Sequence, residues 1–251
     1  PHVSSGAPRG GLAVATYLDC VGREVDVLRL DDVAKVVDPS SALRSAELPG
    51  QIRELLDVLR PSWAGLTGSR ALGTASASSD YDLLIYDAKA SRVYGALRDL
   101  AEDGLISECE PEVRALKVSD SFDRREFDLV HGVKLLDSCY KGVPYTIRLL
   151  AERRASPCRS RFVSLGWVRG LLDIEDGGEA YLTPARYKGH LDGLGGVVLY
   201  TWRTRYQELP AGKYFVTALA QLNESERAVY IIPDIGGALR PATLWRRVHG
   251  A

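Results

Sequence analysis

The sequence predicts an α+β core followed by a small all-β domain with a barrel-like arrangement of strands. Helical periodicities alternate with short strand patterns up to residue 150, whereas only strand-like stretches follow residue 161. Residues 152–161 are rich in Arg, Ser and Pro, which is typical of a linker. We therefore expect a β-rich segment over 1–40, a core of mixed sheet and helices over 41–152, and an all-β domain over 153–251.

The core elements are predicted from the spacing of apolar residues. Residues 48–60 carry Ile52, Leu55 and Leu59 at helical spacing, and Pro61 marks the end of that helix. Residues 88–102 give a second helix, which Gly104 closes. The remaining expectations are one or two strands within 12–30, a break at 38–41, strands at 63–67, 80–86, 126–130 and 145–150, and a helix at 111–120.

The second half of the chain reads as strands separated by turns. Five strand-like stretches are divided by Gly- and Pro-bearing turns or, before the last stretch, by a polar turn. Short strands at this spacing favour a small barrel or sandwich, and a five-stranded barrel of the oligonucleotide-binding kind fits the count. The expected strands are 162–174, 180–187, 197–206, 213–222 and 228–232.

Composition limits where the protein works and what it contacts. The charge-free runs are far shorter than the ~20 apolar residues of a membrane span, so we expect no membrane partner. The four cysteines are widely spaced and match neither a zinc site nor a disulfide framework, which favours the reducing cytoplasm. The chain has 25 Arg but 7 Lys, one Asn, three Gln and no Met. This composition fits a thermophile and equally fits GC-rich coding.

Charge is distributed unevenly along the chain. Residues 1–152 carry 18 basic and 24 acidic side chains, whereas residues 153–251 carry 14 basic and 9 acidic ones. The positive second half favours an anionic partner, although a chance partition gives the same pattern.

One acidic motif carries the strongest chemical signal. Asp80 and Asp82 are two residues apart in a predicted strand, so both carboxylates lie on one face. Neighbouring carboxylates repel each other unless a cation lies between them, and Mg²⁺ favours one or two carboxylates together with substrate phosphates. Gly68 and Ser69 follow the preceding strand, and a turn of this kind can hold a phosphate. Two solvated aspartates on an exposed strand are the structural alternative.

At these residues the sequence resembles the polymerase-beta-like nucleotidyltransferase superfamily. Gly68, Ser69, Asp80 and Asp82 match its pattern of Gly-Ser after one strand and Asp-x-Asp on the next. The overall layout also resembles a group of archaeal predicted nucleotidyltransferases with a β-rich C-terminal domain. That second resemblance rests on the motifs Tyr-Thr-Ile-Arg-Leu-Leu at 145–150 and Leu-Thr-Pro-Ala-Arg-Tyr at 182–187.

The resemblance implies a metal-dependent reaction. Asp80, Asp82 and a third acid would hold two Mg²⁺ ions, or Mn²⁺, while Gly68, Ser69 and Arg70 would bind the nucleotide phosphates. We assign Asp128 as the third acid, with Glu126 as its competitor on the same strand face. Arg70 has a second interpretation, as a solvated surface residue.

The expected activity is transfer of a nucleoside monophosphate from an NTP to a hydroxyl. The acceptor is left open among RNA or DNA, a protein side chain and a small molecule. Trp202, Arg203 and Arg205 are candidate nucleic-acid contacts, because aromatic platforms among cations bind single strands. The same aromatic residues would equally form the core of the β domain. The alternative function is a catalytically silent nucleic-acid-binding protein that retains the fold.

Overall fold

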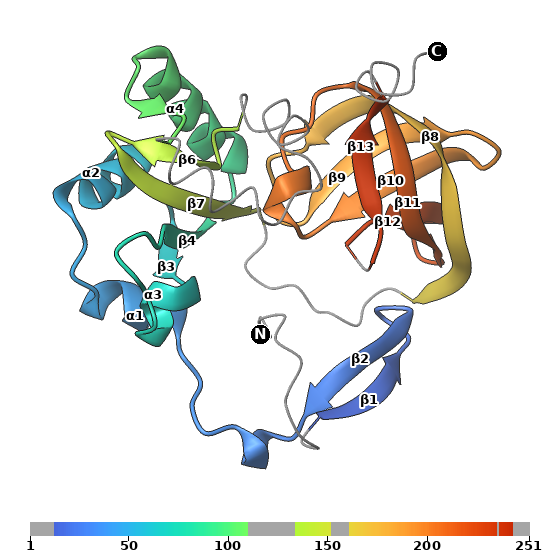
Figure 1. Cartoon of the computed structure of the whole chain (residues 1–251), viewed down its shortest axis with the longest axis horizontal. Helices are drawn as coiled ribbons and strands as arrows, with labels where there is room; N and C mark the ends of the chain where they lie inside the picture. The colour runs from blue at the N-terminus through green and yellow to red at the C-terminus, as the bar shows by residue number, and fades with distance from the viewer. Residues whose placement is uncertain (1–12, 110–133, 152–160, 235, 243–251) are drawn as a thin grey trace.

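The computed structural model describes residues 13–109, 134–151, 161–234 and 236–242. These residues form a two-stranded hairpin, a five-stranded sheet with helices and a six-stranded sheet. Figure 1 shows the helical half and the β half next to each other, with the hairpin projecting below them. The mixed content of helices and several sheets agrees with the predicted fold class.

The helical half contains most of the elements that the apolar spacing predicts. Its elements, together with the N-terminal hairpin, are β1 (Ala13–Leu18), β2 (Arg23–Leu28), the 3-10 turn η1 (Leu30–Asp32), α1 (Pro39–Ser45), α2 (Gly50–Leu59), β3 (Trp63–Leu66), α3 (Gly68–Leu72), β4 (Tyr81–Tyr86), α4 (Ala90–Glu102), β5 (Ile106–Ser107), β6 (Asp137–Tyr140) and β7 (Val143–Leu150). The predicted helix at 111–120 and the strand at 126–130 lie outside the described residues.

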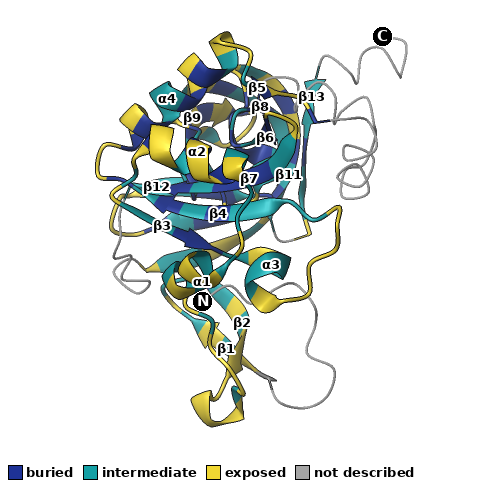
Figure 2. Cartoon of the chain, turned by 90° about the vertical axis from the view of Figure 1, so that its left-hand side faces the viewer, coloured by how far each residue is buried: buried dark blue, intermediate teal, exposed yellow. Residues whose placement is uncertain are grey.

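Helices α2 and α4 cover one face of the five-stranded sheet. Ile52, Leu55 and Leu59 of α2 and Val93 and Leu97 of α4 are all fully buried. They pack against the apolar residues of β4 and β7 in one hydrophobic cluster. Figure 2 shows the outward sides of both helices as exposed. Truncating one of these leucines to alanine costs about 2–5 kcal/mol, so this layer is a large part of what holds the sheet together.

The predicted break at residues 38–41 is in fact the start of helix α1. Asp38 is the N-cap, and its carboxylate accepts a hydrogen bond from the Ser41 amide at 2.7 Å. That hydrogen bond lowers the pKa of Asp38. Pro39 occupies the first helical turn, where its missing N–H costs nothing. Asp, Pro and Ser often follow the end of a strand, but they also favour the start of a helix, and here they begin α1.

The five-stranded sheet has the order β3-β4-β7-β6-β5. β4 and β7 run parallel, and the other neighbours are antiparallel. β6 and β7 form a hairpin whose turn residues, Lys141 and Gly142, both have positive φ values, at 47° and 81°. Such a turn matches the right-handed twist of the two strands and fixes their register.

The β half is a strongly curled sheet. Its elements are β8 (Phe162–Glu179), β9 (Ala185–Leu191), β10 (Gly195–Thr201), the 3-10 turn η2 (Thr204–Tyr206), β11 (Gly212–Asn223), β12 (Ala228–Ile232) and β13 (Ala238–Pro241). β12 pairs with β11 over five residue pairs and with β10, in parallel, over two. The hydrogen-bonded neighbours therefore follow one another from β8 through β9, β10, β12 and β11 back to β8.

The β half departs from the expected domain in three ways. We describe it as a curled sheet and not as a closed barrel, because the β10–β12 pairing is so short. Strand β13 was not predicted: it has four residues, ends on Pro241 and takes its place from pairing with β11. The predicted strand at 180–187 also begins later, at Ala185.

The N-terminal hairpin is attached to the β half. The Gln221 side-chain amide donates to the carbonyls of Val21 and Gly22 at 3.0 Å each. The Phe162 amide donates to the Asp19 carbonyl at 2.8 Å. Gly22 has a φ of 68°, and a β-carbon there would meet the Phe162 side chain. The expected segment 1–40 is thus joined through its β-turn to the strands at the far end of the sequence.

Candidate functional site

Asp80 and Asp82 lie where the sequence motif predicts. Asp80 directly precedes β4 and Asp82 is its second residue. Leu83 and Ile85 face the helical core and are fully buried, so Asp82 lies on the opposite face of the sheet. Both aspartates are partly exposed, which leaves their carboxylates accessible to a ligand.

Gly68 brings the turn after β3 against the Asp82 carboxylate. The Thr67 amide donates to the Asp82 carbonyl at 2.8 Å, which joins the end of β3 to β4. Gly68 follows with a φ of 66°, and a β-carbon built on it would collide with Asp82 Oδ2. The absence of a side chain at position 68 is therefore a requirement of the local geometry. Ser69 is the next residue of α3 and is partly exposed.

Strands β7 and β6 add two polar residues to the same face. Register pairs Asp82 with Thr146, and Thr146 with Asp137, so the three residues form a row across β4, β7 and β6. Thr146 Oγ1 donates to Asp80 Oδ2 at 2.8 Å and lies 3.3 Å from Asp137 Oδ1. Asp80, Asp82, Thr146 and Asp137 are called the acidic face below.

Asp137 is the acidic residue that sequence reasoning missed. The Lys141-Gly142 turn was a usable signal, because it implies a strand on each side and sets Asp137 opposite Thr146. The predicted third acid, Asp128, and its competitor Glu126 lie outside the described residues.

Arg70 makes its contacts within the protein. Its guanidinium donates to the Ser79 carbonyl and, at 3.0 Å, to the Asp80 carbonyl. The same group lies 3.9 Å from the centre of the Tyr81 ring. These contacts hold the loop before β4 against α3, and so help to place Asp80.

The acidic face meets part of the requirement for a divalent cation. Mg²⁺ takes oxygen ligands and binds through one or two carboxylates plus substrate phosphates, and Asp80 and Asp82 supply such a pair on one face. No group of three Asp, Glu, His or Cys side chains is close enough to hold a metal within the described ranges. The carboxylate pair thus fits the cation, and any third protein ligand depends on residues outside those ranges or on movement of Asp137.

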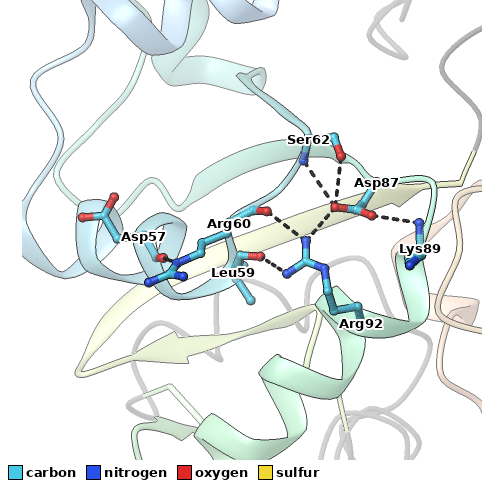
Figure 3. Close-up of polar contacts among 7 residues, drawn as sticks. All are labelled: Asp57, Leu59, Arg60, Ser62, Asp87, Lys89 and Arg92. Atoms are coloured by element: carbon cyan, nitrogen blue, oxygen red, sulfur yellow. Dashed lines mark hydrogen bonds and ion pairs between the residues drawn. The ribbon is translucent and has the colours of Figure 1, made fainter.

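An ion pair between the buried Asp87 and the exposed Arg92 fixes the opposite end of β4. Asp87 follows that strand, and its carboxylate accepts hydrogen bonds from Arg92 at 2.6 Å, from the Lys89 amide and from Ser62 (Figure 3). Arg92 also donates to the carbonyls of Leu59 and Arg60, which end helix α2. The Arg92 contact lowers the pKa of Asp87. The network ties β4, α2 and α4 together, which fixes the strand that carries the acid pair.

A buried carboxylate joins the β half to the helical half. Glu208 accepts hydrogen bonds from the amides of Leu135 and Leu136 at 2.9 and 3.1 Å, and from the Tyr94 hydroxyl at 3.0 Å. Burial raises the pKa of Glu208 despite these donors. Tyr94 also stacks on Tyr181 with ring centres 4.5 Å apart. The two halves are thus bound by a specific polar and aromatic contact.

The candidate nucleic-acid residues do not lie in one alternating strand. β10 ends at Thr201, because Asp234 accepts hydrogen bonds from the Thr201 hydroxyl and the Trp202 amide, both at 2.6 Å. Trp202 is 44% exposed and meets the edge of Tyr200, whereas Tyr206 is buried in η2. Arg203 is exposed and Arg205 is partly buried. The predicted strand over 197–206 was wrong beyond residue 201.

The β half itself is electrically balanced within its described residues. Residues 161–234 and 236–242 contain nine Lys or Arg and nine Asp or Glu. Arg186, for example, pairs with Glu226 at 2.6 Å and with Glu179 at 3.5 Å. The basic excess of residues 153–251 therefore resides in the sequence of 153–160 and 243–251.

The cysteine prediction was wrong. Cys109, which follows β5, and Cys139 of β6 form a disulfide across 30 residues of sequence. Cys20 is disulfide-bonded as well, and none of the described cysteines is free. The wide spacing of the cysteines did not indicate these bonds, because the fold decides which cysteines come together. The spacing argument for a reducing compartment therefore no longer holds.

Comparison of the chain with protein-family models, with curated proteins and with solved structures finds no match. No helix in the described part of the chain has the length and hydrophobicity of a membrane span.

Proposed function

We propose that the protein is a Mg²⁺-dependent nucleotidyltransferase, which moves a nucleoside monophosphate from an NTP to a hydroxyl acceptor. One observation carries the proposal: the Asp82 carboxylate lies against Gly68, so the Asp-x-Asp strand and the Gly-Ser turn meet in space. These motifs are separated by ten residues of sequence and their contact is what the family resemblance requires. The Thr146 hydroxyl beside Asp80 adds a polar neighbour on the same face.

Each residue then has a chemical role. Asp80 and Asp82 would hold the cation, and bound Mg²⁺ supplies charge for the triphosphate and lowers the pKa of an attacking hydroxyl. Gly68 lets the phosphates approach the backbone closely, and the Ser69 hydroxyl is available to bond a phosphate oxygen. Thr146 orients the Asp80 carboxylate through its hydrogen bond. Asp128 stays our proposed third acid, and among the described residues Asp137 contacts the same Thr146 hydroxyl as Asp80.

The direct test is nucleotide transfer from labelled NTPs. Each of the four NTPs, labelled on the α-phosphate, is incubated with the protein, Mg²⁺ or Mn²⁺, and separate pools of RNA, DNA and the protein itself. Label transfer to one pool identifies both the nucleotide and the acceptor class. Absence of transfer to all three pools would exclude them as acceptors, and absence of pyrophosphate release also when small hydroxyl compounds are added would contradict the proposal.

Nucleic-acid binding without catalysis is the second candidate, and one observation favours it. Five strands of the β half follow one another in a ring of neighbours, which is compatible with the partly open Greek-key barrel of oligonucleotide-binding domains. The basic excess of that half lies in the sequence of 153–160 and 243–251, and Trp202 is an exposed aromatic residue, so phosphate contacts and stacking are both available to a single strand. Tight binding of single strands by a protein that transfers no nucleotide would favour this candidate.

A further inference from the structure

The carboxylate of Glu208 lies at the boundary between the two halves of the molecule. Glu208 follows η2 in the β half and is 8% exposed. Its backbone has a φ of 55°, a conformation that residues other than Gly seldom adopt. Its own amide donates to the Ala180 carbonyl at 2.9 Å, which anchors it within the β half. A residue held in this way presents its side chain in one fixed direction.

The three donors to this carboxylate all belong to the helical half. Two are the successive amides of Leu135 and Leu136, and the third is the Tyr94 hydroxyl of α4. Two neighbouring N–H groups on one carboxylate fix the direction of the backbone at that point. The segment is fixed further by Lys134, whose ammonium donates to the Thr204 carbonyl at 2.8 Å.

Leu135 and Leu136, which donate to Glu208, directly precede Asp137 of the acidic face. Asp137 is the next residue after Leu136 and the first residue of β6. The Leu136 carbonyl accepts from the Ile147 amide at 2.7 Å, and the Leu135 carbonyl accepts from the Tyr145 hydroxyl at 2.6 Å. The hydrogen bonds of Glu208 therefore set the point from which β6 starts and Asp137 meets Thr146.

We infer that Glu208 is a positioning residue of the acidic face, which it reaches through the backbone of Leu135 and Leu136. The inference rests on the proposed function. Glu208 contacts α4 and the start of β6, so it acts on Asp137 and Thr146 and not on substrate. Loss of a group that hydrogen-bonds directly to a metal ligand typically lowers metal affinity about 10–100-fold, and Glu208 acts one step further out, so we expect the lower end of that range. The β half is then part of the catalytic apparatus, since it supplies the carboxylate that aligns β6.

The test compares Glu208→Gln with Tyr94→Phe in the full-length protein. The amide of glutamine keeps the size of the side chain, but only one of its two terminal atoms is an acceptor. One of the two backbone N–H groups, which now bond different carboxylate oxygens, would therefore face an NH2 donor. Tyr94→Phe removes one hydrogen bond from the same carboxylate and leaves the Leu135 and Leu136 contacts in place. Mn²⁺ affinity is measured by titration followed by electron paramagnetic resonance, and the melting temperature of each variant is measured in parallel.

We expect Glu208→Gln to weaken Mn²⁺ binding at least ~10-fold and Tyr94→Phe to change it less than ~2-fold. If Glu208→Gln does not fold, Glu208→Asp provides the comparison, with a smaller loss expected. Wild-type affinity in a folded Glu208 variant overturns the inference, and so does an absence of Mn²⁺ binding by the wild type. A wild type that binds Mn²⁺ but transfers no nucleotide contradicts the proposed function alone.

Discussion

The Asp82 carboxylate occupies the space that a β-carbon on residue 68 would need. Gly68→Ala should therefore push the Gly-Ser turn away from β4 and lower nucleotide transfer at least ~10-fold, about 1.4 kcal/mol of barrier. Gly73→Ala is the matched control, because Gly73 also has a positive φ, at 72°, but open space around it. Both variants should lose about 1–2 kcal/mol of stability, and only the first should lose activity. Equal activity in the two variants would show that the close contact between Gly68 and Asp82 is not needed for transfer.

Removal of the acid on β4 should abolish the proposed chemistry. Asp82→Ala is expected to lower the rate of transfer at least ~100-fold, about 2.7 kcal/mol of barrier, with an unchanged circular dichroism spectrum. Asp99→Ala, at an exposed position of α4, is the control for a lost surface carboxylate. Full activity in Asp82→Ala would reject the role of the acid pair.

Trp202 offers a test of nucleic-acid binding. Trp202 is 44% exposed, so Trp202→Ala should lower the melting temperature less than loss of a fully buried aromatic residue would. If the ring stacks on a base, affinity for single strands should fall by about 1–3 kcal/mol at every salt concentration. Trp167→Ala is the control, because Trp167 is 55% exposed on β8.

The two arginines next to Trp202 predict how binding depends on salt. Arg203→Ala with Arg205→Ala should reduce the slope of log affinity against log salt concentration by about 0.7 for each lost phosphate contact. Unchanged binding in all these variants would remove this surface from consideration.

The Asp87–Arg92 pair predicts how stability depends on pH. The pKa of Asp87 is lowered in the folded protein, so its contribution is complete above the unfolded value near 3.8 and is lost as pH falls below it. Asp87→Asn should cost about 1–3 kcal/mol at pH 7. It should also reduce the acid-induced loss of stability between about pH 4 and pH 2. Urea unfolding at several pH values measures both effects. If the unfolding free energies of wild type and variant fall equally as the pH is lowered, the expected reduction in acid-induced loss is wrong.

The Cys109–Cys139 bond predicts protection from alkylation. In the unreduced, unfolded protein, neither cysteine should react with iodoacetamide. The double variant Cys109→Ser with Cys139→Ser should lose about 2–4 kcal/mol of unfolding free energy. Reductant should destabilise the wild type by at least as much, because it also breaks the bond at Cys20. Ready labelling of Cys139 without reductant would show that this bond does not form.

Local patterns predicted the elements that have their own periodicity. The helical spacing of Ile52, Leu55 and Leu59 predicted α2 within two residues at each end, and the strand expected at 80–86 is β4. Both patterns are set by residues only a few positions apart. The same is true of the face that Asp80 and Asp82 share.

Features that depend on contacts between elements could not be predicted from local sequence patterns. β6 reads Asp-Ser-Cys-Tyr, which has no alternation, and it is a strand because β7 pairs with it. The end of β10 depends on Asp234, 33 residues beyond Thr201. Asp137 and Glu208 likewise take their places from contacts across the fold. For β10 and Glu208 the deciding partner lies far away along the chain, whereas β6 and Asp137 depend on the neighbouring strand β7.

The attachment of the N-terminal hairpin has a consequence for folding during synthesis. Gln221, which donates to the Gly22 carbonyl, is made 199 residues after it. At about 5–20 residues per second, this delay is on the order of 10–40 s. Within that interval the hairpin gains its first backbone contact only when Phe162, which donates to the Asp19 carbonyl, has been made. The hairpin can therefore be fixed in place only after the whole helical half has left the ribosome.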